Sequence, residues 1–130
     1  MTRTITTHKL NGCNDQITVE ANDKPGDPGD ACHRYRMEGP RKQVIGIGMV
    51  PSFQTDIRFH RGPLDAYGPI GTTNEAMLAI VIDRLEGFQS GAFACDENAA
   101  ALAHMREALA VLHSRTQKRL DRGVEGTLEP

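Results

Sequence analysis

The first half of the chain consists of short apolar and β-branched runs separated by turn-forming residues. Clusters of glycine, proline, asparagine and aspartate lie between the runs, as is typical of turns between strands. We expect strands at Thr4–Leu10, Gln16–Glu20, His33–Glu38, Gln43–Val50 and Gln54–Phe59. The pattern predicts an antiparallel sheet or a small half-barrel over residues 1–70.

From residue 71 onward the apolar positions recur with helical spacing. Thr72 precedes Glu75 by three residues, which is the spacing of a capping box, and a helix is expected over residues 73–88. One stripe of this helix is apolar and comprises Leu78, Val81, Ile82, Leu85 and Phe88. Met77 and Ile80 lie outside the stripe, so we expect contacts with the sheet and the next helix, and a second subunit is a further candidate.

A second helix is expected after the glycine-containing link "EGFQSGAFACDE". It begins at Asp96 or Glu97, whose negative charge suits a first turn, and runs to about Arg122. Gly123 follows as a natural C′ residue. Two helices joined by a short link form an αα-hairpin. The predicted fold class is therefore α+β, with an N-terminal antiparallel β-sheet followed by a C-terminal αα-hairpin.

Length and charge narrow the classes of protein and of partner. A chain of 130 residues fits one domain, which we expect to contain a β-region (1–70) and a helical hairpin with a C-terminal tail (71–130). The net charge of −2 provides no field toward DNA or a membrane, so neither a nucleic acid polymer nor a membrane is an expected partner. Three widely spaced cysteines suggest a reducing cytoplasm.

The C-terminal stretch "SRTQKRLDRGVEGT" is the strongest candidate for ligand chemistry. Arg115, Arg119 and Arg122 lie at positions i, i+4 and i+7, so they share one face of a helix. The planar guanidinium group donates paired hydrogen bonds and suits phosphate. Cations in a last helical turn also complement the helix dipole, and spacing alone favours that simpler interpretation.

The residues that follow the helix change this balance. Gly123 and Gly126 lack side chains and leave backbone N–H groups open, and Thr127 adds a hydroxyl donor. A terminus that merely ends in solvent requires none of these features. The stretch as a whole therefore favours an anion site.

Other candidate sites are weaker. The segment "VIGIGMV" has no third glycine and no following helix, so its glycines are expected in a bulge or close approach, not in a dinucleotide site. The five histidines lack metal-ligand spacing, and Cys32 and His33 would point to opposite faces of a strand. We expect no catalytic residues, no metal site and no cofactor. Taken alone, Phe88 suits a core and Asn98 suits a helix cap.

Two long segments resemble a known family of phage proteins. The run "FHRGPLDAYGPIGTTNEAMLAIVIDRLEGFQSGAFACDENAAALAHMREALAVLHSRTQKRLDRGVEGT" resembles the helical hairpin of the anti-Thoeris and anti-CBASS cyclic-nucleotide sponges. The segment "DKPGDPGDACHRYRM" resembles the β-region of the anti-Thoeris branch. The resemblance implies an immune-evasion protein in the host bacterial cytoplasm. Such proteins sequester glycocyclic ADP-ribose signals and, in many members, cyclic di- or trinucleotides without cleaving them. It also implies a homo-oligomer, from dimer to hexamer.

The resemblance further implies roles for individual residues. The positions around the ADP-ribose-type ligand correspond to Arg34, Phe88, Asn98, Arg115 and Arg119, with Phe88 stacked on a base and the arginines on phosphates. The segment that contacts cyclic oligonucleotides corresponds to Arg122, Gly123, Gly126 and Thr127. Family members commonly carry a basic residue in place of Asp96. An acid facing the pocket would repel a phosphate, so trinucleotide binding is less expected than binding of ADP-ribose-type signals.

Two other functions compete with the sponge. One is an enzyme that degrades the same signals with His33 or His60 as general base, and the other is a structural phage protein or nucleic-acid binder. The lack of paired carboxylates or metal-ligand spacing argues against hydrolysis. The net charge disfavours a nucleic-acid binder.

Overall fold

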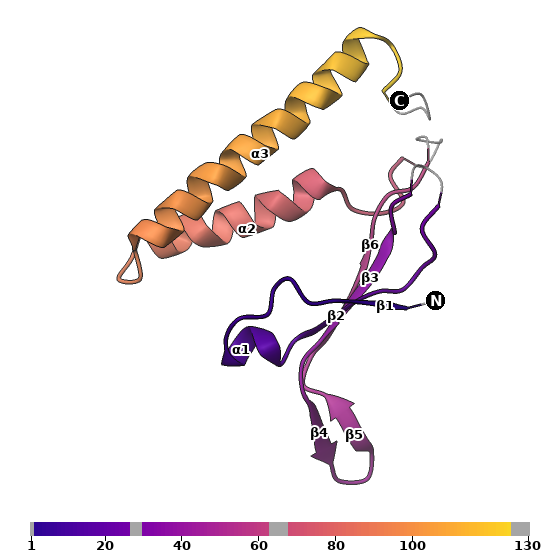
Figure 1. Cartoon of the computed structure of the whole chain (residues 1–130), viewed down its shortest axis with the longest axis vertical. Helices are drawn as coiled ribbons and strands as arrows, with labels where there is room; N and C mark the ends of the chain where they lie inside the picture. Colours follow the sequence, from indigo (N-terminus) through magenta and orange to yellow (C-terminus); the bar gives the residue numbers. More distant parts are fainter. Residues whose placement is uncertain (1, 27–29, 63–67, 126–130) are drawn as a thin grey trace. The chain divides into compact units, whose positions relative to one another are not determined.

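The computed structural model describes residues 2–26, 30–62 and 68–125 of the chain. Strands occupy the first half and two long helices occupy the second (Figure 1), which confirms the predicted α+β class. The chain divides into two compact units, residues 1–61 and 62–130. This boundary precedes the composition change expected near residue 70. That the chain is a single domain remains a prediction.

The first unit is built on a four-stranded antiparallel sheet. Its strands, in spatial order, are β1 (Arg3–Ile5), β2 (Thr18–Ala21), β3 (Arg34–Glu38) and β6 (Gln54–Arg58). Successive side chains of a strand point to opposite faces. Tyr35 lies opposite Ala21 and Ile57 on the apolar face, where Ala21 is 0% exposed. The other face carries the charged residues of β3 and β6.

A two-stranded hairpin continues from β3 and β6. It consists of β4 (Arg41–Val44) and β5 (Gly48–Pro51), so the prediction of one strand over Gln43–Val50 is wrong. The reason is backbone conformation, because Gly46 and Gly48 have φ values of 83° and 103° and reverse the chain. The glycines of "VIGIGMV" therefore form a hairpin turn, where a bulge or close approach was expected.

The first expected strand is also shorter than predicted. Only Arg3–Ile5 pairs with β2, and beyond it the Lys9 N–H donates to the Thr6 carbonyl at 3.0 Å in a turn. A single helical turn, α1 (Gly12–Asp15), follows. It forms because the Asn11 side chain accepts from the Asn14 N–H at 2.7 Å, which is a capping interaction that the sequence analysis did not anticipate.

The second unit contains the predicted helical hairpin. Its helices are α2 (Asn74–Gln89) and α3 (Asp96–Asp121), which pack against each other (Figure 1). The cap of α2 is Thr73, whose hydroxyl accepts from the Ala76 N–H at 3.1 Å, so the expected Thr72–Glu75 capping box is wrong by one residue. Helix α3 begins at Asp96, as predicted.

Few side chains of the hairpin are fully covered. Ile82 of α2 and Leu102 of α3 are 7% and 6% exposed, whereas Val81 and Ile80 are 41% and 65% exposed. Val81 was expected on the packed stripe but is exposed. An apolar surface on α2 therefore has no cover within the described part of the chain. Among the described residues, neither α2 nor α3 combines the length and the hydropathy that a membrane-spanning helix requires.

Candidate functional site

The C-terminal end of α3 is closed by a glycine cap. Gly123 has φ 74° and occupies the C′ position predicted for it. Its N–H donates to the Leu120 carbonyl at 3.0 Å, and the Val124 N–H donates to the Arg119 carbonyl at 3.0 Å. This pair of bonds is a Schellman motif, and it turns the chain back over the last helical turn.

The returning chain holds Arg119 in place. Nε of Arg119 donates to Oε2 of Glu125 at 3.1 Å, and Nη2 donates to the Val124 carbonyl at 3.0 Å. Arg119 is 7% exposed, and no other charged residue among residues 2–26, 30–62 and 68–125 is buried. A buried charge needs such partners. Arg119 therefore supports the helix end, and a ligand anion would share its guanidinium with Glu125.

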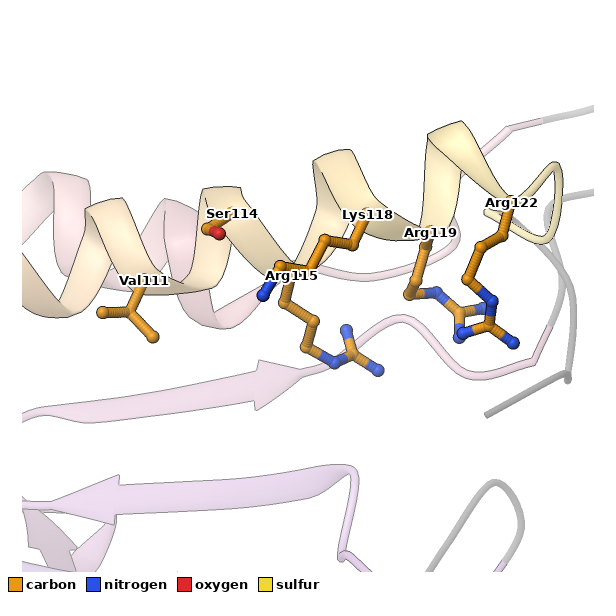
Figure 2. Close-up of a pocket in the computed structure, with 6 residues that line it drawn as sticks. All are labelled: Val111, Ser114, Arg115, Lys118, Arg119 and Arg122. Atoms are coloured by element: carbon orange, nitrogen blue, oxygen red, sulfur yellow. The ribbon is translucent and has the colours of Figure 1, made fainter.

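A cavity of about 320 Å³ lies beside this end of α3. Its lining residues are Val111, Ser114, Arg115, Lys118, Arg119 and Arg122. Figure 2 shows the three arginine side chains extending from one side of the helix, as their spacing predicts. Lys118 and Ser114 were not proposed as site residues. Lys118 follows Arg115 by three residues, so helical spacing alone places it beside the arginines.

The charge around the cavity is strongly positive. Arg115 and Lys118 are exposed, and neither side chain has an ion pair within the described part of the chain. The nearby carboxylate of Glu125 is bound to Arg119. Four cations therefore line the cavity, and Glu125 binds one of them, Arg119. Such an arrangement suits an anion with several acceptor oxygens.

Phe88 and Asn98 lie at the opposite end of the hairpin. The Phe88 ring meets Phe93 edge-on with centroids 6.2 Å apart, and the Arg84 guanidinium carbon lies 5.0 Å from the Phe88 centroid. The Asn98 N–H donates to Sγ of Cys95 at 3.4 Å, so Cys95 is the cap and Asn98 is not. At ~1.5 Å of rise per residue, Asn98 and Arg115 are separated by roughly 25 Å along α3.

This separation limits what a single hairpin can do. Phe88 and Asn98 cannot meet Arg115 and Arg119 around one small ligand when all four belong to the same chain. Asp96 is exposed, is the first residue of α3, and shares the Asn98 end. It does not line the arginine cavity within its own chain.

Arg34 lies in the other unit and lines a cavity of about 400 Å³ on the charged face of the sheet. Arg36, Asp56 and Arg58 also line it, and the sequence analysis named none of them. The signal that could have found them is the alternation of charged residues along both strands. This alternation indicates one shared charged face only when β3 and β6 are known to pair with each other.

The position of Arg34 is fixed by a carboxylate from the preceding loop. The Asp23 side chain accepts from the His33 N–H at 2.8 Å and from the Arg34 N–H at 3.0 Å. Burial alone would raise the pKa of Asp23, but the hydrogen bonds from His33 and Arg34 outweigh it and hold this pKa below its usual value. The charged carboxylate thus anchors the start of β3.

Two predicted site residues, Gly126 and Thr127, lie outside the described residues. His33 and His60, the candidate general bases, lie near the end of the sheet and are both half-buried. Among residues 2–26, 30–62 and 68–125, no three His, Cys, Asp or Glu side chains gather in a way that could hold a metal ion.

The chain matches a family model and a known phage protein. Residues 54–117 match the family model of the Acb2/Tad1 hairpin domain, a range that contains Arg58 and Arg115 but neither Arg34 nor Arg119. A relative, Thoeris anti-defense 1 of Bacillus phage SBSphiJ7, is 47% identical over 95 residues. The aligned part covers 73% of this chain and 66% of the relative. The chain thus spans slightly less than two thirds of that relative's length.

Proposed function

The chain belongs to the family of phage anti-Thoeris proteins that carry the Acb2/Tad1 hairpin domain, and we propose that it blocks Thoeris defence as a sponge. It binds the nucleotide second messenger and sequesters it uncleaved in the host bacterial cytoplasm. Glycocyclic ADP-ribose isomers are the first ligand class. The observation that carries the proposal is the cavity at the end of α3, which is lined by four cations, two of them the exposed Arg115 and Lys118.

The chemistry of the cavity fits the phosphates of such a signal. Arg115 and Lys118 are exposed and have no ion pair within the described residues, so binding a phosphate does not first break an internal bond. Arg119 is already oriented by Glu125, which reduces the entropy lost when it binds. A dissociation constant of 1 nM corresponds to about 12 kcal/mol. Several charge-assisted hydrogen bonds and base stacking on Phe88 supply energy of this order.

The separation of the two hairpin ends supports a site shared by two copies of the chain. In a two-fold dimer with antiparallel hairpins, Phe88 and Asn98 of one copy meet Arg115 and Arg119 of the other, and the symmetry generates two equal sites. The exposed apolar side chains Ile80 and Val81 of α2 and Val111 of α3 provide surface for such contacts. Larger assemblies up to hexamers extend the same principle. Light scattering at micromolar concentration tests this, and a monomer contradicts it.

A second ligand class is the cyclic di- and trinucleotides of CBASS defence. Arg122 and Gly123 at the helix end, with Gly126 and Thr127 beyond it, would contact these larger rings. Asp96 is exposed at the other end of the hairpin, where a second copy would bring it near a ligand phosphate. Its charge disfavours trinucleotides, and we therefore rank them below ADP-ribose-type signals.

Ligand release distinguishes the sponge from an enzyme that degrades the same signals. The protein is incubated with glycocyclic ADP-ribose, separated from free ligand, heated to denature it, and the released nucleotide is identified by mass spectrometry. Recovery of the intact ligand supports sequestration. Recovery of a cleaved product identifies an enzyme, and absence of any bound nucleotide rejects the ligand class.

A further inference from the structure

The charged face of the sheet is organised in rows that cross the strands. The register places Glu20 of β2, Arg36 of β3 and Asp56 of β6 side by side in one row. The next row contains Arg34 of β3 directly opposite Arg58 of β6. Asn22 extends this second row, because its N–H donates to the Arg34 carbonyl at 2.8 Å. The two rows differ sharply in charge balance.

In the first row the single cation, Arg36, is paired with an acid. Nε of Arg36 donates to Oδ1 of Asp56 at 2.7 Å, and Nη1 of Arg36 lies 3.8 Å from Oε1 of Glu38. The hydrogen bond from Arg36 lowers the pKa of Asp56 below its usual value, so this acid stays charged and bound to Arg36. Asp56 precedes Arg58 by two residues on the same face of β6. Asp56 is nevertheless bound to Arg36 of the neighbouring strand and not to Arg58.

The second row contains two cations and no acid. Within residues 2–26, 30–62 and 68–125, the side chains of Arg34 and Arg58 form no ion pair or hydrogen bond. Like charges directly opposite each other on a sheet are unfavourable, and the Cβ atoms of such a pair are only ~4.5–5.5 Å apart. The cavity of about 400 Å³ lies at this row and is lined by both arginines and Asn22. An anion between the guanidinium groups would remove the repulsion.

We propose that Arg34 and Arg58 together bind one phosphate group, with Asn22 at its side. The ligand class is a phosphate ester, either the pyrophosphate or a phosphodiester of a nucleotide. The inference rests on the proposed function, and it adds Arg58 as a binding residue beside Arg34. The forks of two arginines can surround a single phosphate with four N–H donors. The Asp23 carboxylate holds the backbone of Arg34 so that its side chain starts from a fixed point.

The inference is tested by isothermal titration of the full chain with two probes, glycocyclic ADP-ribose and inorganic pyrophosphate. Arg58→Gln is expected to weaken binding of both by about 10- to 100-fold, the range for a lost hydrogen bond to a charged group. Arg58→Lys keeps the charge without the fork and is expected to recover part of the affinity. The matched control is Arg3→Gln, because Arg3 lies on the same sheet but opposite Ala21 on the other face. It should bind like the native chain.

A double substitution shows whether both arginines hold the same phosphate. If they do, Arg34→Gln/Arg58→Gln loses less affinity than the two single losses multiplied together, since one ligand group mediates both effects. Losses that multiply independently contradict a shared phosphate. The losses should also shrink as NaCl is raised, because these side chains are exposed and salt screens them.

The two probes separate this inference from the proposed function. If the native chain binds glycocyclic ADP-ribose and both Arg58→Gln and Arg3→Gln bind it with the same affinity, Arg58 has no role in binding. The proposed sponge function is then unaffected. Binding of pyrophosphate alone, lost in Arg58→Gln, overturns the sponge and supports the arginine pair. Binding of neither probe overturns both. Circular dichroism of each variant confirms that it is folded, and Arg58→Lys carries the test if Arg58→Gln does not fold.

Discussion

The two clusters of arginines in this protein are built in opposite ways. On α3 the cations come from one continuous helix, and one of them, Arg119, is buried and held by Glu125 of the same chain. On the sheet Arg34 and Arg58 are 24 residues apart in sequence and face each other from neighbouring strands, and neither is paired with an acid among the described residues. The comparison shows that a cation held by its own chain supports the fold first. An unpaired cation is free to serve a ligand.

Arg115→Ala is expected to give the largest change in affinity. Arg115 is exposed and has no ion pair within the described residues, so its loss removes ligand contacts and little else. We expect binding of glycocyclic ADP-ribose to weaken about 10- to 100-fold, with the free energy of unfolding changed by less than ~0.5 kcal/mol. Titration calorimetry and urea unfolding measure the two effects. Arg106→Ala is the control, because it removes an exposed α3 arginine that pairs with Glu86. Equal affinity in Arg115→Ala and Arg106→Ala would contradict a phosphate role for Arg115.

Arg119→Met is expected to lower the stability of the fold, in contrast to Arg115→Ala, which mainly lowers ligand affinity. The substitution removes the partner of Glu125 and of the Val124 carbonyl, and we expect unfolding in urea to become easier by about 1–3 kcal/mol. Lys118→Met is the matched comparison, because Lys118 lines the same cavity but is exposed. It should weaken ligand binding without a similar loss of stability. Equal stability of the two variants would show that the contacts of Arg119 with its own chain do not stabilise the fold.

Gly123→Ala tests the cap that brings Glu125 back to Arg119. An alanine at φ 74° is strained, and the expected cost is about 1 kcal/mol of unfolding free energy. Gly91→Ala is the control, because Gly91 does not have a positive φ and an added Cβ meets no atom within 4 Å. Thermal unfolding of both variants measures the difference. If Gly91→Ala is destabilised as much as Gly123→Ala, the cap does not carry this cost.

The smallest expected effect is the loss of stability at acidic pH, which arises from Asp23 at the start of β3. The pKa of Asp23 is lower in the folded state than its ordinary value of 3.8, so its contribution to stability is present above that value. The contribution is lost as the pH falls below 3.8 and through the folded-state pKa. Urea unfolding between pH 3 and 6 should therefore show a decline at the acid end that is weaker in Asp23→Asn. Identical pH profiles for the native chain and Asp23→Asn would show that this carboxylate does not anchor β3.

The parts of the fold that local patterns specify were predictable. Both long helices, the glycine at the end of α3 and the shared face of Arg115, Arg119 and Arg122 follow from helical spacing and cap preferences. The α2 cap was misplaced by one residue because Thr72 and Thr73 are equally good caps in sequence. The hairpin turn at Gly46 was missed because an apolar run with two glycines also fits a continuous strand.

The parts that depend on pairing between distant segments were not predictable. Arg58 is a candidate binding residue only because it lies opposite Arg34, and no spacing within one strand predicts that neighbour. The bond between Arg119 and Glu125 was also missed, because it forms only after Gly123 has reversed the chain. Sequence spacing placed the arginines together but did not reveal which of them the chain itself engages.

The most direct test of the account is complementation between two binding-deficient variants, Asn98→Ala and Arg115→Ala. In the proposed dimer Asn98 of one copy lies beside Arg115 of the other, so a mixed dimer contains one site that lacks both residues and one intact site. Each variant alone should bind glycocyclic ADP-ribose weakly. Their co-refolded equal mixture should recover tight binding at roughly a quarter of the native sites, because random pairing makes half of the dimers mixed. No recovery in a mixture shown to exchange subunits would contradict a pocket shared between two copies.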